Sequence, residues 1–237
     1  MKITTAPAFA GFPAEGLAFL AGLREDNSKA FFDAHRTTYE AALLAPAKAF
    51  VVALGEELRM RVSPAIRAEP HVNGSILRIN RDIRFNVDKR PYKTYLDMVV
   101  WAGEGHSRER PGFFVRLEPE GVTLSAGIHR FERPALDAYR AAVLDEEAGP
   151  ALEDAIARGT ARRGVSIEPS DWVRAPRGFD PDHPRVRLLM YGGLYAEGRW
   201  DPPRVIARAG FVRWAATRLE GMAPVERWLT AVLDGER

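Results

Sequence analysis

Apolar residues in the first part of the chain recur every three or four positions, which is the spacing of amphipathic helices. One stripe begins at Leu17, and Asn27 or Ser28 is placed to cap a second helix. Pro46 suits the first turn of a third helix, because proline loses no hydrogen bond there. The pattern therefore predicts a helical segment over residues 13–62.

Over residues 75–128 the pattern changes to short runs that are rich in β-branched and aromatic residues. Residues 75–80 and 92–101 are the first two predicted strands. Residues 113–128 predict a hairpin, since the sequence Glu-Pro-Glu-Gly at its centre favours a type I turn. We therefore expect this region to be mainly β.

Helical periodicity returns at Pro134 and extends over most of residues 134–234. It is interrupted by RAPRGFDPDHP, whose prolines predict a rigid, extended loop. Two closing helices are expected, one beginning near Pro202 and one at Pro224.

Together these elements predict an α+β fold over residues 1–237. We expect a single domain, in which a central, mostly antiparallel sheet has the N-terminal and C-terminal helices packed on it.

Composition excludes several classes of function. The chain contains no cysteine, which excludes disulfides, thiolate metal ligands, iron–sulfur clusters and cysteine nucleophiles. The N-terminal residues lack the apolar core of a secretion signal, and we expect a cytoplasmic protein. No apolar run reaches the roughly 20 residues that span a bilayer, so no membrane association is expected.

The charge of the chain is concentrated in one segment. Residues 78–94, RINRDIRFNVDKRPYKT, contain six cationic side chains and two carboxylates, a local balance of +4, whereas the whole chain carries +2. A strand here would place alternate residues on one face, and a helix after Asn80 would align Arg81, Arg84 and Asp88. Either geometry gathers guanidinium groups, whose planar forks bind phosphate or carboxylate.

This segment predicts binding of a phosphorylated or carboxylated small molecule. The predicted ligand-binding residues are Arg78, Arg81, Arg84, Lys89, Tyr92 and Lys93. Asp82 and Asp88 are expected to orient the arginines, and His183, from the proline-rich loop, is a further candidate for a supporting acid or base. Neither a catalytic residue nor a cofactor is indicated by the sequence.

Two other functions are compatible with the same residues. The cations could bind nucleic-acid phosphates while Phe85, Tyr92 and Tyr95 offer stacking faces, although the small net charge makes this less favourable. Alternatively, the charges could form an ion-pair network in a structural or partner-binding domain. None of the five histidines pairs at the spacing of a zinc motif, so no metal site is predicted.

Nine residues of the basic segment also stand at a fixed spacing: Arg78, Arg81, Asp82, Arg84, Phe85, Asp88, Lys89, Pro91 and Tyr92. This motif resembles the signature of the uncharacterised family catalogued as domain of unknown function 2461, found in many bacteria and some fungi. The resemblance extends to Asp26-Asn27 near the N-terminus and to the Asp182-His183-Pro184 loop. The family has no established activity, so the resemblance implies no catalytic residue.

Overall fold

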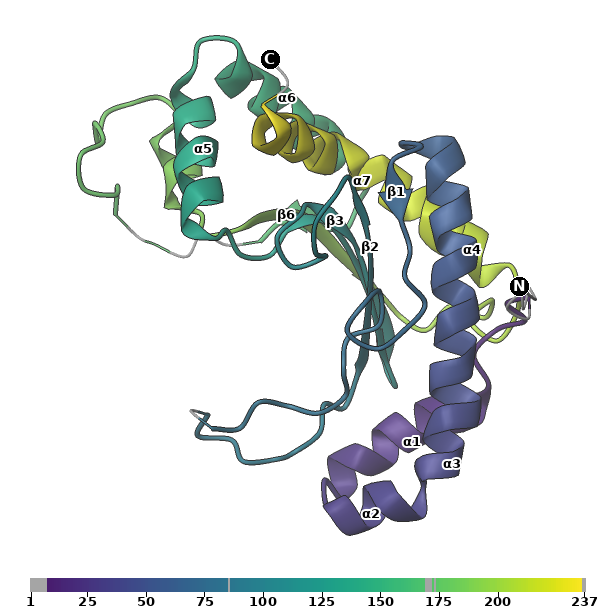
Figure 1. Cartoon of the computed structure of the whole chain (residues 1–237). Helices are drawn as coiled ribbons and strands as arrows, with labels where there is room; N and C mark the ends of the chain where they lie inside the picture. Colours follow the sequence, from purple (N-terminus) through teal and green to yellow (C-terminus); the bar gives the residue numbers. More distant parts are fainter. Residues whose placement is uncertain (1–7, 85, 169–171, 173, 236–237) are drawn as a thin grey trace. The chain divides into compact units, whose positions relative to one another are not determined.

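The computed structural model describes residues 8–84, 86–168, 172 and 174–235 (Figure 1). Its helices and six-stranded antiparallel sheet confirm the predicted α+β class. In chain order the elements are α1 (Ala14–Glu25), α2 (Lys29–Ala34), α3 (Arg36–Thr38), the π-helix η1 (Tyr39–Leu44), α4 (Ala45–Arg61), β1 (Ile66–Arg67), β2 (Leu96–Ala102), β3 (Gly112–Glu118), β4 (Gly121–Ile128), α5 (Arg133–Leu144), α6 (Ala148–Gly159), β5 (Val165–Ile167), the 3-10 helix η2 (Val186–Met190), β6 (Leu194–Trp200) and α7 (Phe211–Asp234).

The strand order in the sheet is β1-β2-β3-β4-β6-β5. The predicted hairpin forms its middle as β3 and β4. In β3, Phe113, Val115 and Leu117 are buried, whereas the residues between them are half-buried. This alternation is the period of two that a strand imposes when one face of the sheet lines the core.

The chain forms two compact units. The first comprises Met1–Val100, Phe114–Thr123 and Arg199–Thr217, and the second comprises Trp101–Phe113, Leu124–Gly198 and Arg218–Arg237. The expectation of a single domain stays a prediction.

The first unit contains the N-terminal helices. Ser28 caps α2 by accepting a hydrogen bond from the backbone N–H of Phe31, and Pro46 lies in the first turn of α4. The chain is helical without a break from α3 to α4, because η1 joins them. Helix α4 contacts β1 (Figure 1), and the ring of Phe50 stacks on that of Phe211 at a centroid distance of 5.1 Å. The predicted helical segment is confirmed.

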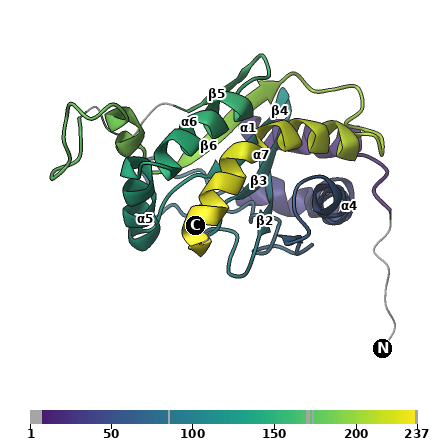
Figure 2. The same ribbon diagram turned by 90° about the horizontal axis from the view of Figure 1, so that it is seen from above.

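In the second unit α5 and α6 lie next to one another (Figure 2). Tyr139 of α5 is fully buried, and its hydroxyl donates to the carbonyl of Leu188 at 2.7 Å. Trp228 of α7 donates its indole N–H to the carbonyl of Ala148 in α6 at 3.0 Å. Residues 174–184 contain turns and no helix or strand, as the prolines predicted.

The strand prediction for residues 75–80 is wrong, because this segment forms isolated bridges and no continuous strand. Ile76 bridges to Val72 and Met98, and Asn80 bridges to Tyr92. The second predicted strand begins at Leu96 instead of Tyr92. Irregular pairing replaces a ladder here because the chain leaves the sheet to form a long polar loop. Strands β1, β5 and β6 were not predicted, since they are short or adjoin a proline-rich stretch.

The prediction of a helix that starts at Pro224 is also wrong, because α7 passes through this residue. Proline removes one backbone hydrogen bond from a helix interior. Leu219 and Met222 before it and Val225 and Leu229 after it are all buried. A single apolar stripe therefore holds both halves of α7 in one helix.

Candidate anion-binding site

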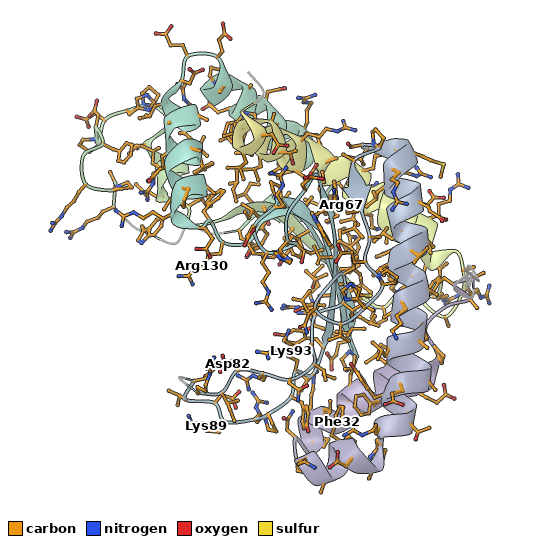
Figure 3. The ribbon with its side chains drawn as sticks, in the orientation of Figure 1. Phe32, Arg67, Asp82, Lys89, Lys93 and Arg130 are labelled. Atoms are coloured by element: carbon orange, nitrogen blue, oxygen red, sulfur yellow. The ribbon has the colours of Figure 1, made fainter. Side chains whose placement is uncertain are left out.

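The basic segment forms a loop with a short paired stem. The backbone N–H of Arg81 donates to the carbonyl of Pro91 at 2.8 Å, and that of Lys93 donates to the carbonyl of Ile79 at 2.8 Å. We call residues 81–90 the basic loop. Figure 3 shows Asp82 and Lys89 out on this loop and Lys93 at its base.

Asn27 and Phe32 fasten the stem to the N-terminal helices. The Asn27 amide accepts from the N–H of Tyr92 at 2.9 Å and donates to the carbonyls of Tyr92 at 3.1 Å and Leu23 at 2.7 Å. The buried ring of Tyr92 stacks on Phe32 with centroids 4.5 Å apart. Tyr92 therefore fixes the base of the loop, and its predicted contact with a ligand stays a prediction.

Short polar side chains shape the basic loop. Asp82, Asn86 and Asp88 each accept, through Oδ1, a hydrogen bond from the backbone N–H two residues later. Such local bonds replace the regular bonding of helices and strands. In its described residues, the loop accordingly contains neither the strand nor the helix considered for this segment, and Phe85 lies outside the described residues.

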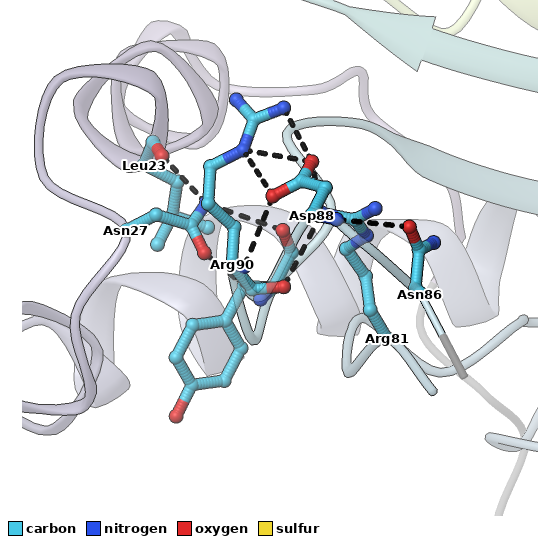
Figure 4. A network of polar contacts seen from close by, with 7 residues as sticks. Leu23, Asn27, Arg81, Asn86, Asp88 and Arg90 are labelled. Atoms are coloured by element: carbon cyan, nitrogen blue, oxygen red, sulfur yellow. Dashed lines mark hydrogen bonds and ion pairs between the residues drawn. The ribbon is translucent and has the colours of Figure 1, made fainter. Parts of the chain in front are cut away.

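Two aspartates hold three guanidinium groups of the loop. Figure 4 shows the contacts of one of them, Asp88, with Arg81 and Arg90. Arg84 contacts Asp82 through Nε at 3.0 Å and Nη2 at 2.7 Å. Asp88 accepts from Nε of Arg90 at 3.0 Å, from its Nη2 at 2.7 Å, and from Nη1 of Arg81 at 2.6 Å. These bonds fix the orientation of the three guanidinium groups, and the role of the two aspartates in ligand binding stays a prediction.

The pKa values of both aspartates reflect these bonds. The side-chain and backbone hydrogen bonds from Arg84 lower the pKa of Asp82 to about 2. Hydrogen bonds from Arg90 and then Arg81 hold the pKa of Asp88 well below its ordinary value. Both groups are carboxylates at neutral pH.

Lys89 of the loop and Arg78, which precedes the loop, are two further cations of the basic segment. Lys89 donates from Nζ to the carbonyl of Ile83 at 2.9 Å, a neutral acceptor that leaves the ammonium charge in place. Arg78 is exposed, and its charge contributes to the low pKa of Asp82.

A second cluster, the inner centre, lies at the base of the loop and consists of Lys93, Tyr95, Asp97 and Arg116. Arg116 of β3 contacts Asp97 of β2 through Nε at 2.7 Å and Nη2 at 3.2 Å. Lys93 Nζ lies 3.6 Å from the same carboxylate. The side chains of Lys93 and Asp97 are only 18% and 14% exposed, whereas that of Arg116 is 42% exposed.

The ring of Tyr95 lies among these charges. The Arg116 guanidinium carbon is 3.9 Å and Lys93 Nζ is 5.6 Å from its centroid, both within cation–π distance. Burial raises the pKa of Tyr95, whereas the positive charges of Arg116 and Arg81 oppose this rise. Charges from the loop stem and from β3 therefore act on one tyrosine.

Sequence reasoning found Lys93 but missed Asp97 and Arg116 as members of this cluster. Arg116 is a lone charge inside the apolar run of β3, and that exception to the pattern was the available signal. Nothing local in the sequence indicated that its partner is Asp97.

His183 belongs to the second unit, whereas the other predicted site residues belong to the first. Its Nδ1 accepts from the backbone N–H of Arg185 at 3.1 Å, and Asp180 accepts from that of Asp182 at 2.9 Å. These bonds are those of turn-forming side chains. In the described part of the chain, no three His, Asp or Glu side chains are grouped as metal ligands.

The fold and the site define an α+β protein with a carboxylate-braced loop of arginines and lysines. The chain belongs to the family described as conserved hypothetical protein (DUF2461), whose model matches residues 15–228. Comparison with curated proteins gave no significant match. Among the described residues, no helix combines the length and apolar character that a membrane span needs.

Proposed function

We propose that the protein binds a phosphorylated or carboxylated small molecule at the basic loop and the inner centre. The binding residues are Arg78, Arg81, Arg84, Lys89, Lys93 and Arg116, with Tyr92 fixing the loop. The observation that carries this proposal is the gathering of Lys93, Arg116 and the charge of Arg81 around Tyr95.

The balance of charge supports the same conclusion. The basic segment and the inner centre together contain seven cationic side chains and three carboxylates, Asp82, Asp88 and Asp97. Each carboxylate forms an ion pair with at least one cation, and Asp88 and Asp97 each pair with two. Oriented guanidinium groups in excess over acids are suited to binding an anion, because little side-chain entropy remains to be lost.

A thermal-shift panel of phosphorylated and carboxylated metabolites tests the proposal. A ligand of the folded state raises the melting temperature by mass action, and Lys93→Met should abolish the rise. Lys48→Met removes an exposed lysine of α4 and serves as the control. If no compound in the panel shifts the wild-type protein, the proposal is refuted.

Nucleic acid is the second candidate ligand, and the openness of the loop favours it. Arg84 and Arg90 are 76% and 58% exposed, as expected of contacts to an extended polyanion. Two of the expected stacking faces are already in contact with the protein, because Tyr92 packs on Phe32 and the Arg116 guanidinium lies over Tyr95. The third, Phe85, lies outside the described residues. Binding of an oligonucleotide that weakens steeply with salt, with a smaller slope in Arg84→Ala, would support this candidate.

A purely structural role makes a different prediction for the same variant. The Arg84–Asp82 pair is exposed, so its loss should change stability little. In that case Arg84→Ala alters the melting temperature slightly and affects no ligand.

A further inference from the structure

The cations of the proposed site are divided into two groups by their burial and by their acidic partners. Lys93 and Arg116 share Asp97 at the base of the loop. Arg84, Lys89 and Arg90 lie out on the loop, where Asp82 and Asp88 are the acids. We call the three loop residues the outer group.

Each group retains positive charge after its carboxylates are counted. Lys93 and Arg116 contact one carboxylate, Asp97, which leaves +1 among these residues. The charge of Glu118 also acts on Arg116, but this carboxylate has its own cation in Arg199. In the basic loop, Arg81, Arg84, Lys89 and Arg90 stand against Asp82 and Asp88, which leaves +2. The excess positive charge is therefore divided between the inner centre at the base of the loop and the loop itself.

Lys93 lies at the base of the loop and Lys89 out on it (Figure 3). The oxygens of a single phosphate or carboxylate match one guanidinium fork, so a ligand that uses both groups needs more than one anionic group. We infer that the ligand carries a chain of phosphate groups, one held by Lys93 and Arg116 and a further one by the outer group. This inference rests on the proposed function and names its substrate class as a polyphosphate-bearing molecule.

The roles of the two groups follow from their exposure. Lys93 and Arg116 are less exposed than Arg84 and Arg90, so water screens their contacts less and they should provide most of the affinity for the first phosphate. The exposed outer group should add affinity only when the ligand is long enough to reach it.

Calorimetric titration with orthophosphate and with tripolyphosphate, at neutral pH and without divalent metal, tests the inference. Wild-type protein should bind tripolyphosphate on the order of tenfold more tightly than orthophosphate. In the double variant Arg84→Met/Lys89→Met, this gain should disappear while the affinity for orthophosphate stays the same. In Arg116→Met, both affinities should fall.

A matched control distinguishes a specific contact of the ligand with the outer group from a general effect of net charge. Lys48→Met/Arg213→Met removes two exposed cations from helices of the same unit, so it lowers the net charge by the same amount. This control should keep the preference for tripolyphosphate. An equal loss of the preference in both double variants would overturn the inference, because it would indicate nonspecific attraction.

The two levels of the hypothesis fail in different ways. If neither phosphate binds the wild-type protein and no compound of the thermal-shift panel does, the proposed function fails. If both bind equally well, anion binding stands and the polyphosphate assignment is wrong. Adenosine triphosphate has the same phosphate chain and distinguishes a nucleotide ligand from a free polyphosphate. Tighter binding of adenosine triphosphate than of tripolyphosphate, again lost in Arg84→Met/Lys89→Met, indicates a nucleotide. Equal binding of the two indicates that the phosphate chain alone is recognised.

Discussion

Glu226 is a buried acid whose ionisation should make stability depend on pH. It lies on α7, is 1% exposed, and accepts a hydrogen bond from the Thr230 hydroxyl at 3.0 Å. Burial raises its pKa from 4.5 to about 7, against the opposing charges of Arg227 and Arg110, while Asp234 adds to the rise. The folded protein therefore keeps a proton that the unfolded chain releases in this pH range.

The magnitude follows from the difference between the two pKa values. Below pH 4.5 the group is protonated in both states and has no effect. As the pH rises to about 7, ionisation favours the unfolded state by about 1.4 kcal/mol per pH unit. The free energy of unfolding should therefore lose about 3 kcal/mol across this range, after which the loss stays constant.

Glu226→Gln isolates this contribution, because glutamine has nearly the same shape, can accept from Thr230 and does not ionise. Urea denaturation should show the variant gaining about 3 kcal/mol over the wild type between about pH 4 and about pH 8. Glu153→Gln removes an exposed carboxylate from the same unit and controls for the change in net charge. A Glu226→Gln difference that stays the same at every pH would refute the argument.

Three further substitutions test how the site and the sheet are held. Asn27→Ala removes three hydrogen bonds at the loop stem and should lower the free energy of unfolding, measured by urea denaturation, by about 2–3 kcal/mol. Proteolysis around Tyr92 should become faster, and unchanged proteolysis would contradict the anchoring role. Asp97→Asn removes the carboxylate that Lys93 and Arg116 share, so it should destabilise the protein by about 2 kcal/mol, and added phosphate should restore part of the melting temperature. Gly127→Ala should lower the free energy of unfolding by more than about 3 kcal/mol, because Gly127 has φ +138° and a Cβ there would lie 2.2 Å from the Leu194 carbonyl oxygen. A soluble variant with wild-type stability would show that the strand can move.

Local patterns were sufficient for much of the fold. The N-terminal helices were predicted because apolar periodicity and capping residues such as Ser28 act within a few positions of one another. The β3–β4 hairpin was predictable for the same reason, since its turn chemistry lies between the strands that it joins. Pro224 was misleading, because the local rule against proline in helices was outweighed by packing on both sides of it.

The candidate site was only partly visible in the sequence. The excess of charge in residues 78–94 is a property of composition, so it could be counted without a structure. The partners that organise this charge are distant in sequence: Asn27 holds Tyr92 from 65 residues away, and Arg116 meets Asp97 from 19 residues away. No spacing rule connects such residues.

The sequence by itself determined the fold class, the hairpin and the position of the basic segment, because periodicity, turn residues and charge are local quantities. Only the tertiary structure decided which carboxylate braces which cation, that Arg116 joins Lys93 at Tyr95, and that Glu226 is buried. These properties depend on which surfaces the folded chain brings together and removes from water. The environment of a charged group, and not its place in the sequence, sets its chemistry.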